Sequence, residues 1–262
     1  MIDKIKKRIK QSEKIIVNSD NDRWYRVGSE FKWKPSITTV LSTVLNKGIA
    51  FETWLGNQPS YKIACQERDE AAARGTAVHQ ACEDLLNGKS IDGSDSKWGD
   101  EFNKRLMSFE HWVKNVKPTI VALEHSMYSA DVPFSGTCDI IADIPKKGLS
   151  IIDIKTGQPN ESHILQLTAY KLLWDSLFPE YPILHLYGLY LKGSWISKVE
   201  PQFKEYKFQP AVLSHVMGLW DWLSKGPPRP TNQIKSKFNL DMNQIQNEGE
   251  ELVLWNQEDL EK

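Results

Sequence analysis

The stretch "GLSIIDIKTG", residues 148–157, has the composition of a buried β-strand that ends at a turn. Its isoleucines are β-branched and favour a strand, and a glycine closes it. Two charges interrupt this apolar run, because Asp153 and Lys155 flank Ile154. Side chains two residues apart on a strand point to the same face, so Asp153 and Lys155 are expected to project together, opposite to Ile152 and Ile154. The stretch therefore predicts a strand with one face in the core and one face that carries charge.

The preceding segment, residues 136–144, alternates in the same way and is joined to this strand by the turn "PKKG". A hairpin across this turn would bring Asp139 to within about a residue of facing Asp153. Two such carboxylates repel each other unless a cation lies between them, and Mg²⁺ or Mn²⁺ prefers oxygen ligands of this kind. The alternative interpretations stay open at this point. Asp139 would also suit an edge strand that resists aggregation, and an Asp-x-Lys triplet is expected about once by chance.

The rest of the chain supplies helices and strands around this hairpin. Apolar periodicity predicts helices over residues 1–17, 35–45, 60–86, 97–116, 161–178 and 210–225. Alternating or apolar runs predict strands over residues 119–129, 136–144, 149–155 and 182–192, with an edge pair within 196–208. From residue 60 onward the order is α, α, β, β, β, α, β, β, α, which predicts one mixed sheet flanked by helices. We divide the chain into a basic, helical N-terminal region (1–59), a core (60–225) and a polar, acidic tail (226–262).

Composition excludes several classes of protein. The 262 residues are 40% hydrophobic and 26% charged, as in an ordinary globular protein. The sequence has no long apolar run and no secretory signal pattern, so no membrane association is expected. Three widely spaced cysteines argue for a reducing compartment and against a four-cysteine cluster. We therefore expect a cytoplasmic protein, and the net charge of −1 does not by itself indicate a nucleic-acid partner.

Two helices carry further polar residues at helical spacing. Gly75 and His79 are four residues apart in the long helix, and Gln166 and Tyr170 are four apart in the helix that follows Lys155. A glycine within a helix costs about 1 kcal/mol relative to alanine, which indicates a close approach to a neighbouring backbone. His79 could then lean over the sheet as a nitrogen ligand. A histidine held in the core and simple amphipathic packing of the second helix are the alternatives.

In this order, Gly75-x-x-x-His79, Gly136-Thr-Cys-Asp139, Asp153-Ile-Lys155 and Gln166-x-x-x-Tyr170 resemble the RecB-type branch of the PD-(D/E)XK nuclease superfamily. The resemblance covers about residues 60–192, and it is the ordered set that is specific. The segments "KPSITTVLS" and "EAAARGTAVH" look more narrowly like single-strand exonucleases of the mitochondrial genome-maintenance type and their phage relatives. The resemblance implies an α/β (α+β) fold with a restriction-endonuclease-like core.

The resemblance also implies a role for each residue of the motifs. His79, Asp139, Asp153 and the carbonyl of Ile154 would bind Mg²⁺ or Mn²⁺. Lys155 would orient or activate the attacking water. The other implied residues are Gln166 and Tyr170, which would contact DNA or brace the lysine, and Glu124, which would support the site or be an exposed strand residue. No iron–sulfur cluster and no nucleotide cofactor are expected, since the cysteines are too few and the chain has no Walker A motif.

We therefore expect a metal-dependent deoxyribonuclease that digests single-stranded DNA from an end, in replication, repair or recombination, within a bacterial or phage-infected cell. The expected strand contacts on the helices before the core are Arg68, Arg74, Trp54 and Lys62. A duplex-end exonuclease with the same site is the nearest alternative. A catalytically inactive DNA-binding protein and a phosphohydrolase with another substrate are further ones. Whether the tail binds a polymerase, a single-strand-binding protein or another replication or recombination partner is left open.

Overall fold

The computed structural model describes residues 1–11, 15–18, 22–27, 32–45, 48–94, 96–193 and 200–224. All of these belong to one compact unit, Met1–Pro227. The expected tail, residues 226–262, lies outside the described residues, and the expected boundary at residue 59 stays a prediction. None of the described helices is long and apolar enough to cross a membrane.

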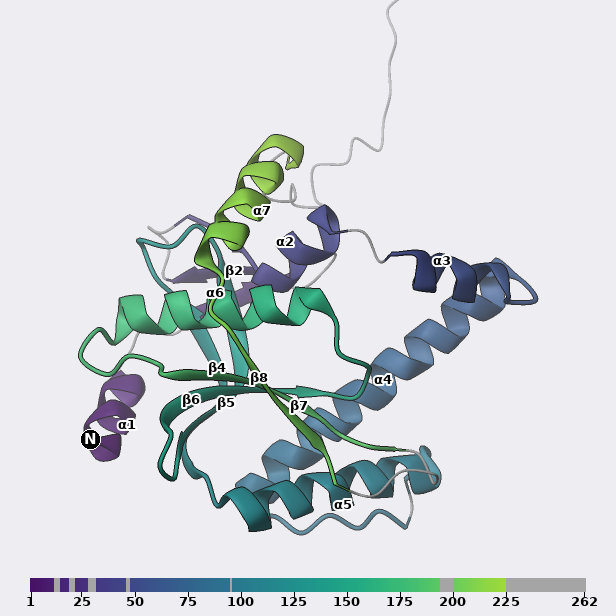
Figure 1. Ribbon diagram of the computed structural model, residues 1–262, viewed down its shortest axis with the longest axis horizontal. Coiled ribbons are helices and arrows are strands. Elements are labelled where there is room, and N and C mark those ends of the chain that lie inside the picture. The colour runs from purple at the N-terminus through teal and green to yellow at the C-terminus, as the bar shows by residue number, and fades with distance from the viewer. Residues whose placement is uncertain are drawn as a thin grey trace, which may run out of the picture. The chain divides into compact units, whose positions relative to one another are not determined.

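A five-stranded sheet in the order β4-β5-β6-β7-β8 forms the centre of the fold (Figure 1). β4, β5 and β6 pair antiparallel, β6 and β7 pair parallel, and β8 returns antiparallel. The sheet is therefore mixed, as the sequence predicted. The strands are β4 (Thr119–Tyr128), β5 (Ser135–Ile144), β6 (Gly148–Lys155), β7 (His185–Tyr190) and β8 (Gln202–Tyr206).

Helices cover both faces of this sheet, and each face has its own apolar core (Figure 1). One face packs against α1 (Ile2–Gln11), α2 (Ile37–Val44), α6 (Glu161–Leu177) and α7 (Pro210–Leu223). The other face packs against α4 (Tyr61–Leu86) and α5 (Gly99–Val116). Ile151 of β6 belongs to the first core, and Ile152 and Ile154 belong to the second. The alternation expected for this strand is confirmed.

The element order predicted from residue 60 onward is confirmed, from α4 and α5 through β4–β6, α6, β7 and β8 to α7. Local capping explains some of the boundaries. The Ser60 side chain accepts a hydrogen bond from the Ile63 N–H at the start of α4, and Asn160 caps α6 in the same way. β7 begins at His185, three residues later than predicted, and only β8 of the expected edge pair is described, because residues 194–199 lie outside the described part.

The sequence missed the smaller elements near the N-terminus. A second sheet consists of β1 (Ile15–Asn18), β2 (Trp24–Val27) and β3 (Lys34–Pro35), and α3 (Ile49–Gly56) precedes α4. The helix predicted over residues 1–17 is confirmed over Ile2–Gln11 and wrong over residues 15–17, which belong to β1. The β-branched residues of β1 pair with β2, and this tertiary pairing overrides the amphipathic pattern that runs into them.

Candidate active site

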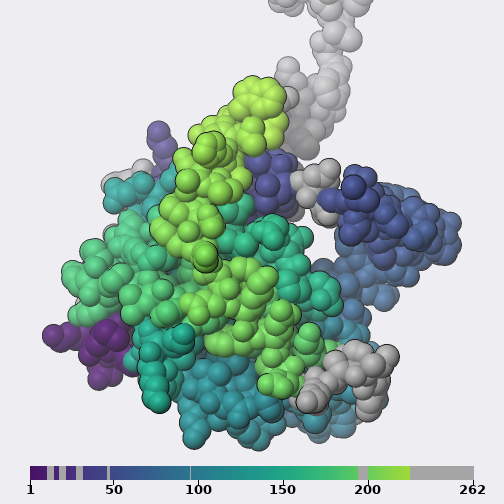
Figure 2. All heavy atoms as spheres, viewed as in Figure 1, coloured from purple at the N-terminus to yellow at the C-terminus, as the bar shows by residue number. Residues whose placement is uncertain are grey.

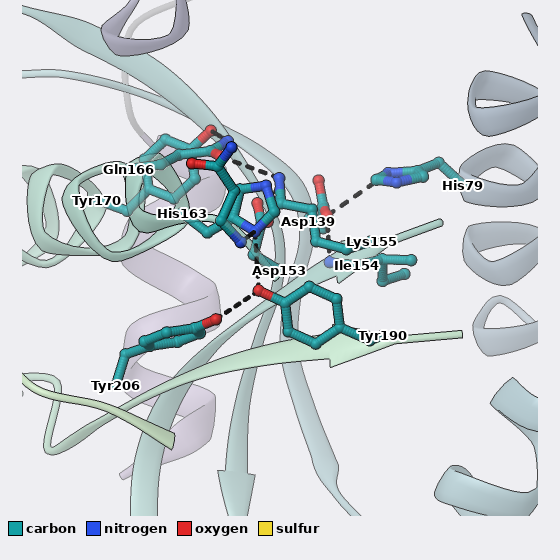
Figure 3. A network of polar contacts seen from close by, with 11 residues as sticks. His79, Asp139, Asp153, Ile154, Lys155, His163, Gln166, Tyr170, Tyr190 and Tyr206 are labelled. Carbon is teal, nitrogen blue, oxygen red and sulfur yellow. Dashed lines mark hydrogen bonds and ion pairs between the residues drawn. The ribbon is translucent and has the colours of Figure 1, made fainter. Parts of the chain in front are cut away.

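The register of the central hairpin places two carboxylates opposite each other where the pairing of β5 with β6 ends, near the middle of β5 and close to the end of β6. The last paired residues are Ile140 and Ile152, and the next residue on each strand is Asp139 and Asp153. Asp153 is 1% exposed, so its carboxyl group has left water almost completely. The Ile154 backbone N–H donates to Asp139 Oδ2 at 2.6 Å, which fixes one carboxylate against the neighbouring strand (Figure 3). The hairpin expected from the sequence is confirmed.

Glu124 adds a third carboxyl group to this row from β4. Its neighbours Leu123 and His125 pair with β5 on either side of Asp139, so Glu124 lies opposite Asp139. Its backbone has a φ of 42°, in the left-handed region that a residue with a side chain adopts at a cost of about 1 kcal/mol or more. The sequence left open a supporting residue or an exposed strand residue here; the structure places Glu124 on β4 opposite Asp139 and exposed, and its supporting role stays a prediction.

His79 reaches the same carboxylate from α4. Its Nδ1 lies 3.5 Å from Asp139 Oδ2 (Figure 3). Gly75, one turn earlier, is where α4 comes close to the end of β6, because a Cβ atom there would lie 3.3 Å from Thr156 Oγ1. The sequence predicted a close approach to a neighbouring backbone, whereas the atom that a Cβ would meet belongs to the Thr156 side chain. Burial opposes a proton on His79, but the hydrogen bond and charge of Asp139 outweigh it and raise the pKa of the imidazole.

Lys155 connects the carboxylates to α6. Its Nζ lies 2.5 Å from Asp153 Oδ2 and donates to Gln166 Oε1 at 2.9 Å. Gln166 Nε2 in turn donates to the Tyr170 hydroxyl at 2.8 Å (Figure 3). Gly136 on β5 makes room for this tyrosine, since a Cβ atom there would come within 2.7 Å of the Tyr170 ring. The structure therefore places Gln166 against Lys155 and Tyr170 against Gln166, as expected if the pair braces the lysine. Their contact with DNA stays a prediction.

The protonation of the carboxyl groups reflects this crowding. Burial, with the charge of Asp139 added, raises the pKa of Asp153 to about 6 in spite of Lys155. Burial also acts on Asp139, but His79 and Lys155 hold the pKa of Asp139 below its usual value. The Glu124 side chain is exposed, but partial desolvation beside the other carboxyl groups and the charge of Asp139 raise its pKa to about 7. The end of the hairpin thus holds more negative charge than its cations balance.

The donor atoms fit a divalent cation. One ligand atom each from His79, Glu124 and Asp139 lies within 4.8 Å of the others. A nitrogen together with carboxylate oxygens suits Mn²⁺ or Mg²⁺. The set expected from the sequence contained Asp153 and the Ile154 carbonyl instead of Glu124. Asp153 lies beside this group but faces Lys155, and its role as a ligand, like that of the Ile154 carbonyl, stays a prediction.

Three of the expected DNA contacts on α3 and α4, Arg74, Arg68 and Trp54, pair with residues other than the site carboxylates. Arg74 Nε is 3.3 Å from Glu101 Oε1, and Arg68 pairs with the adjacent Asp69. Lys62 is exposed in the first turn of α4, and Trp54 packs against Phe51 on α3 with 5.5 Å between the ring centres. Figure 1 and Figure 2 show α3 and the first turns of α4 at one side of the central sheet. The structure does not test their predicted contact with DNA.

The sequence analysis missed Arg105, which holds the ends of β6 and β7 together. This arginine is 8% exposed, and its Nη1 donates to the carbonyls of Thr156 at 2.6 Å and Leu191 at 3.0 Å. Its Nη2 donates to Glu101 Oε1 at 2.6 Å. A cavity of about 520 Å³ lies beside Arg105 and its partners, and Tyr190 also lines it. A charge on the apolar stripe that contains Phe102 and Phe109 is the signal that would have found Arg105.

Comparison with known families matches residues 48–215 to the PD-(D/E)XK nuclease superfamily. Among solved structures, the chain is similar to an alkaline exonuclease (LHK-Exo) from Laribacter hongkongensis, with 10% identity over 71% of this chain and 82% of that one, at a TM-score of 0.35. It is also similar to the protein SSO0001, with 18% identity over 49% of this chain and 61% of that one, at a TM-score of 0.27. Neither score reaches 0.5, so neither likeness adds to the family match. A search of the curated proteins found no match.

Proposed function

Because the chain belongs to the PD-(D/E)XK nuclease superfamily, we propose that it is a metal-dependent exonuclease that hydrolyses single-stranded DNA from an end. Family membership gives the coarser statement, a nuclease with DNA as its substrate. The preference for single strands, the need for an end, the place in the RecB-type branch and a role in replication, repair or recombination are parts of the proposal.

The observation that carries the proposal is the row of carboxyl groups across β4, β5 and β6, with a lysine at its rim. Glu124, Asp139 and Asp153 lie side by side across the three strands, and Lys155 contacts the last of them. A chain has no structural reason to gather like charges around the buried Asp153, so such a cluster favours a functional site. In the proposal His79, Asp139, Glu124 and Asp153 hold the cation. When bound, a divalent cation neutralises charge on a phosphate and lowers the pKa of water.

The residues around this cluster have separate tasks in the proposal. Lys155 stays charged, because the carboxylates Asp153 and Asp139 outweigh its burial and raise its pKa. It therefore serves to orient the attacking water and to stabilise negative charge on the phosphate, rather than to remove a proton. Gln166 holds Nζ in place by accepting one of its hydrogen bonds. Arg105 keeps the ends of β6 and β7 at a fixed separation, so the lysine strand does not move relative to its neighbour.

The preference for single strands is supported by the surface of α3 and α4. Tyr61 is 72% exposed at the start of α4, and Lys62 and Arg74 follow on the same helix. Aromatic rings and cations together suit an unpaired strand, because bases stack on the rings while the cations meet the phosphates. A duplex-end exonuclease would use the same carboxylates but would need a wider channel through which the DNA reaches them. This activity is the second candidate.

Digestion of matched DNA substrates tests the proposal. End-labelled linear single strands, blunt duplexes, 5′- and 3′-tailed duplexes and circular single strands are incubated with Mg²⁺ or Mn²⁺, and with EDTA as the control. We expect rapid loss of linear single strands with metal, none with EDTA, and intact circles. Faster digestion of blunt duplex would favour the second candidate, and cleavage of circles would contradict the need for an end.

Arg74→Ala tests the proposed path of the strand. Loss of one phosphate contact should weaken binding of single-stranded DNA and reduce the slope of log affinity against log salt by about 0.7. Lys114→Ala is the matched control, because Lys114 is an exposed cation on α5 that pairs with Glu110. If Arg74→Ala and Lys114→Ala bind single-stranded DNA with the same affinity and the same salt dependence, Arg74 does not contact the strand.

A further inference from the structure

His163, in the first turn of α6, lies beside the catalytic lysine on the same face as the Gln-Tyr pair. His163, Gln166 and Tyr170 are spaced three and four residues apart, which aligns them along one side of the helix (Figure 3). Gln166 uses its oxygen for Lys155 and its nitrogen for Tyr170. Of these three side chains, His163 lies nearest to the N-terminus of α6.

The hydrogen bonds around His163 fix the position of its proton. The Asn160 backbone N–H donates to His163 Nδ1 at 3.3 Å, and a backbone N–H can only donate. Nδ1 therefore carries no proton, and the Tyr190 hydroxyl, 2.8 Å away, must also donate to it. The Tyr206 hydroxyl, 2.6 Å from that of Tyr190, then donates to Tyr190 in turn (Figure 3). This chain of donors leaves the proton of the neutral ring on Nε2.

The N–H at Nε2 is unused within the described part of the chain. It has no hydrogen-bond partner among the described residues, and it is not one of the buried polar atoms that lack one, so it reaches solvent. Burial, and then the positive charges of Lys155 and Lys204, lower the pKa of His163 to about 4, so the ring stays neutral near pH 7. The two buried tyrosines thus hold a fixed, neutral donor next to two lysines.

We propose that His163 is a substrate-binding residue that donates its Nε2–H to a non-bridging oxygen of a DNA phosphate beside the scissile one. The inference rests on the proposed function and adds a contact to it. An anionic oxygen is the acceptor that the surroundings favour, since Lys155 and Lys204 supply positive charge and His163 supplies the directed donor. Tyr190 and Tyr206 are positioning residues, because they act only through the tautomer of His163.

His163 also accepts the capping hydrogen bond of α6, so the test must separate the cap from the contact with DNA. His163→Gln keeps both an acceptor for the cap and an N–H donor. His163→Glu keeps the cap, which glutamate forms well, but has no donor and repels phosphate. His163→Leu removes both functions. The three variants therefore differ in the donor independently of the helix cap.

The experiment measures single-turnover cleavage of an end-labelled single strand against enzyme concentration, which gives an apparent dissociation constant and a rate constant at saturation. His163→Leu and His163→Glu should raise the dissociation constant about tenfold or more, as for the loss of a hydrogen bond to a charged group. Their rate constants at saturation should change less than the dissociation constants. His163→Gln should recover most of the affinity. Tyr190→Phe should have a smaller effect in the same direction.

A strand with a single methylphosphonate adds a readout that a purely structural role would not move. A methylphosphonate at the phosphate that His163 contacts should weaken binding to the wild type about tenfold. The same substitution should weaken binding to His163→Leu much less. His163→Glu with wild-type affinity, or equal methylphosphonate effects on both proteins, would overturn the inference alone. A wild type that digests no DNA with Mg²⁺ or Mn²⁺ would overturn the proposed function, and the inference with it.

Discussion

Two lysine–aspartate pairs, one near each end of α6, have nearly the same local geometry. Lys155 Nζ is 2.5 Å from Asp153 Oδ2, and Lys171 Nζ is 2.6 Å from Asp175 Oδ2. The two lysine side chains are 19% and 17% exposed, so burial does not distinguish the lysines, whereas the Asp153 side chain is 2% exposed and the Asp175 side chain is 30% exposed. The groups that surround each pair differ as well.

The Lys171 pair is locally balanced. Asp175 Oδ1 accepts from the Ile183 N–H at 2.9 Å, Oδ2 meets the lysine, and Lys171 also donates to the Ile183 carbonyl. At the other end, Asp139 faces the Lys155 pair across the hairpin, with Glu124 beyond it. The first arrangement closes the turn before β7, and the second leaves negative charge unbalanced. We infer that surplus charge, rather than the Asp-Lys contact itself, distinguishes the candidate catalytic pair.

The largest expected difference is in activity. Lys155→Met should lower the rate of metal-dependent DNA digestion about 10³-fold, because the water and the phosphate lose their positioned cation. Lys171→Met, which removes an equally buried lysine from α6, should digest at a rate within about twofold of the wild type. Initial rates on linear single-stranded DNA measure both. Similar rates for Lys155→Met and the wild type would break the comparison.

Asp175→Asn should lower the free energy of unfolding by about 2 kcal/mol. Lys171 then loses its anionic partner in a half-buried site, and such a loss is costly because a charge is left unpaired. Denaturant titration measures the effect. No change in the unfolding midpoint would mean that the Lys171 pair is not the stabilising one.

Glu124→Gln should act in the opposite direction and raise the free energy of unfolding by about 1 kcal/mol in metal-free buffer at neutral pH, a small value because solvent screens this exposed side chain. Desolvation and the charge of Asp139 raise the pKa of Glu124, so the folded state favours the neutral form, which the amide of glutamine imitates. The same denaturant titration, run beside Asp175→Asn, gives the result. Equal destabilisation by the two substitutions would show that both ends of α6 are balanced in the same way.

Acid should expose a further, smaller difference at the Lys155 end. The pKa of His163 is about 4 in the folded protein and about 6.5 in an unfolded chain, so the unfolded state gains the proton first. The stability that the neutral ring contributes is complete above pH 6.5 and is lost as the pH falls toward 4. His163→Gln should therefore lose less stability over this interval than the wild type does. His111→Gln, a change on the exposed surface of α5, is the control, and identical profiles for His163→Gln and the wild type would contradict the expectation.

Much of the core was predictable because its patterns are local. Strand alternation gave the two faces of β6, and the short turn before it set the register that places Asp139 opposite Asp153. The spacing of Gly75 and His79 indicated the side of α4 that approaches the sheet. Each of these inferences depends on residues within one element or one hairpin, where sequence distance and spatial distance agree.

The missed features depend on contacts between distant segments. β1 and β2 are four residues each, and they are strands because they pair with each other. Glu124 has a left-handed backbone between two residues that pair with β5, and no pattern within β4 indicates it. Arg105 joins carbonyl groups that the turn after β6 and the end of β7 supply. A sequence can show that a charge is out of place without showing which backbone groups receive it.

Metal binding in the absence of DNA separates the carboxylates around Lys155 from the Lys171 pair without a nuclease assay, because it depends only on whether the surplus charge holds a cation. Thermal unfolding of the wild type and of Asp139→Asn is followed while Mn²⁺ or Mg²⁺ is added, with Asp175→Asn as the control. The account predicts that the metal raises the unfolding temperatures of the wild type and Asp175→Asn to saturation, as expected for a ligand that binds the folded state, and leaves that of Asp139→Asn almost unchanged. An equal rise in all three proteins, or no rise in the wild type, would contradict it.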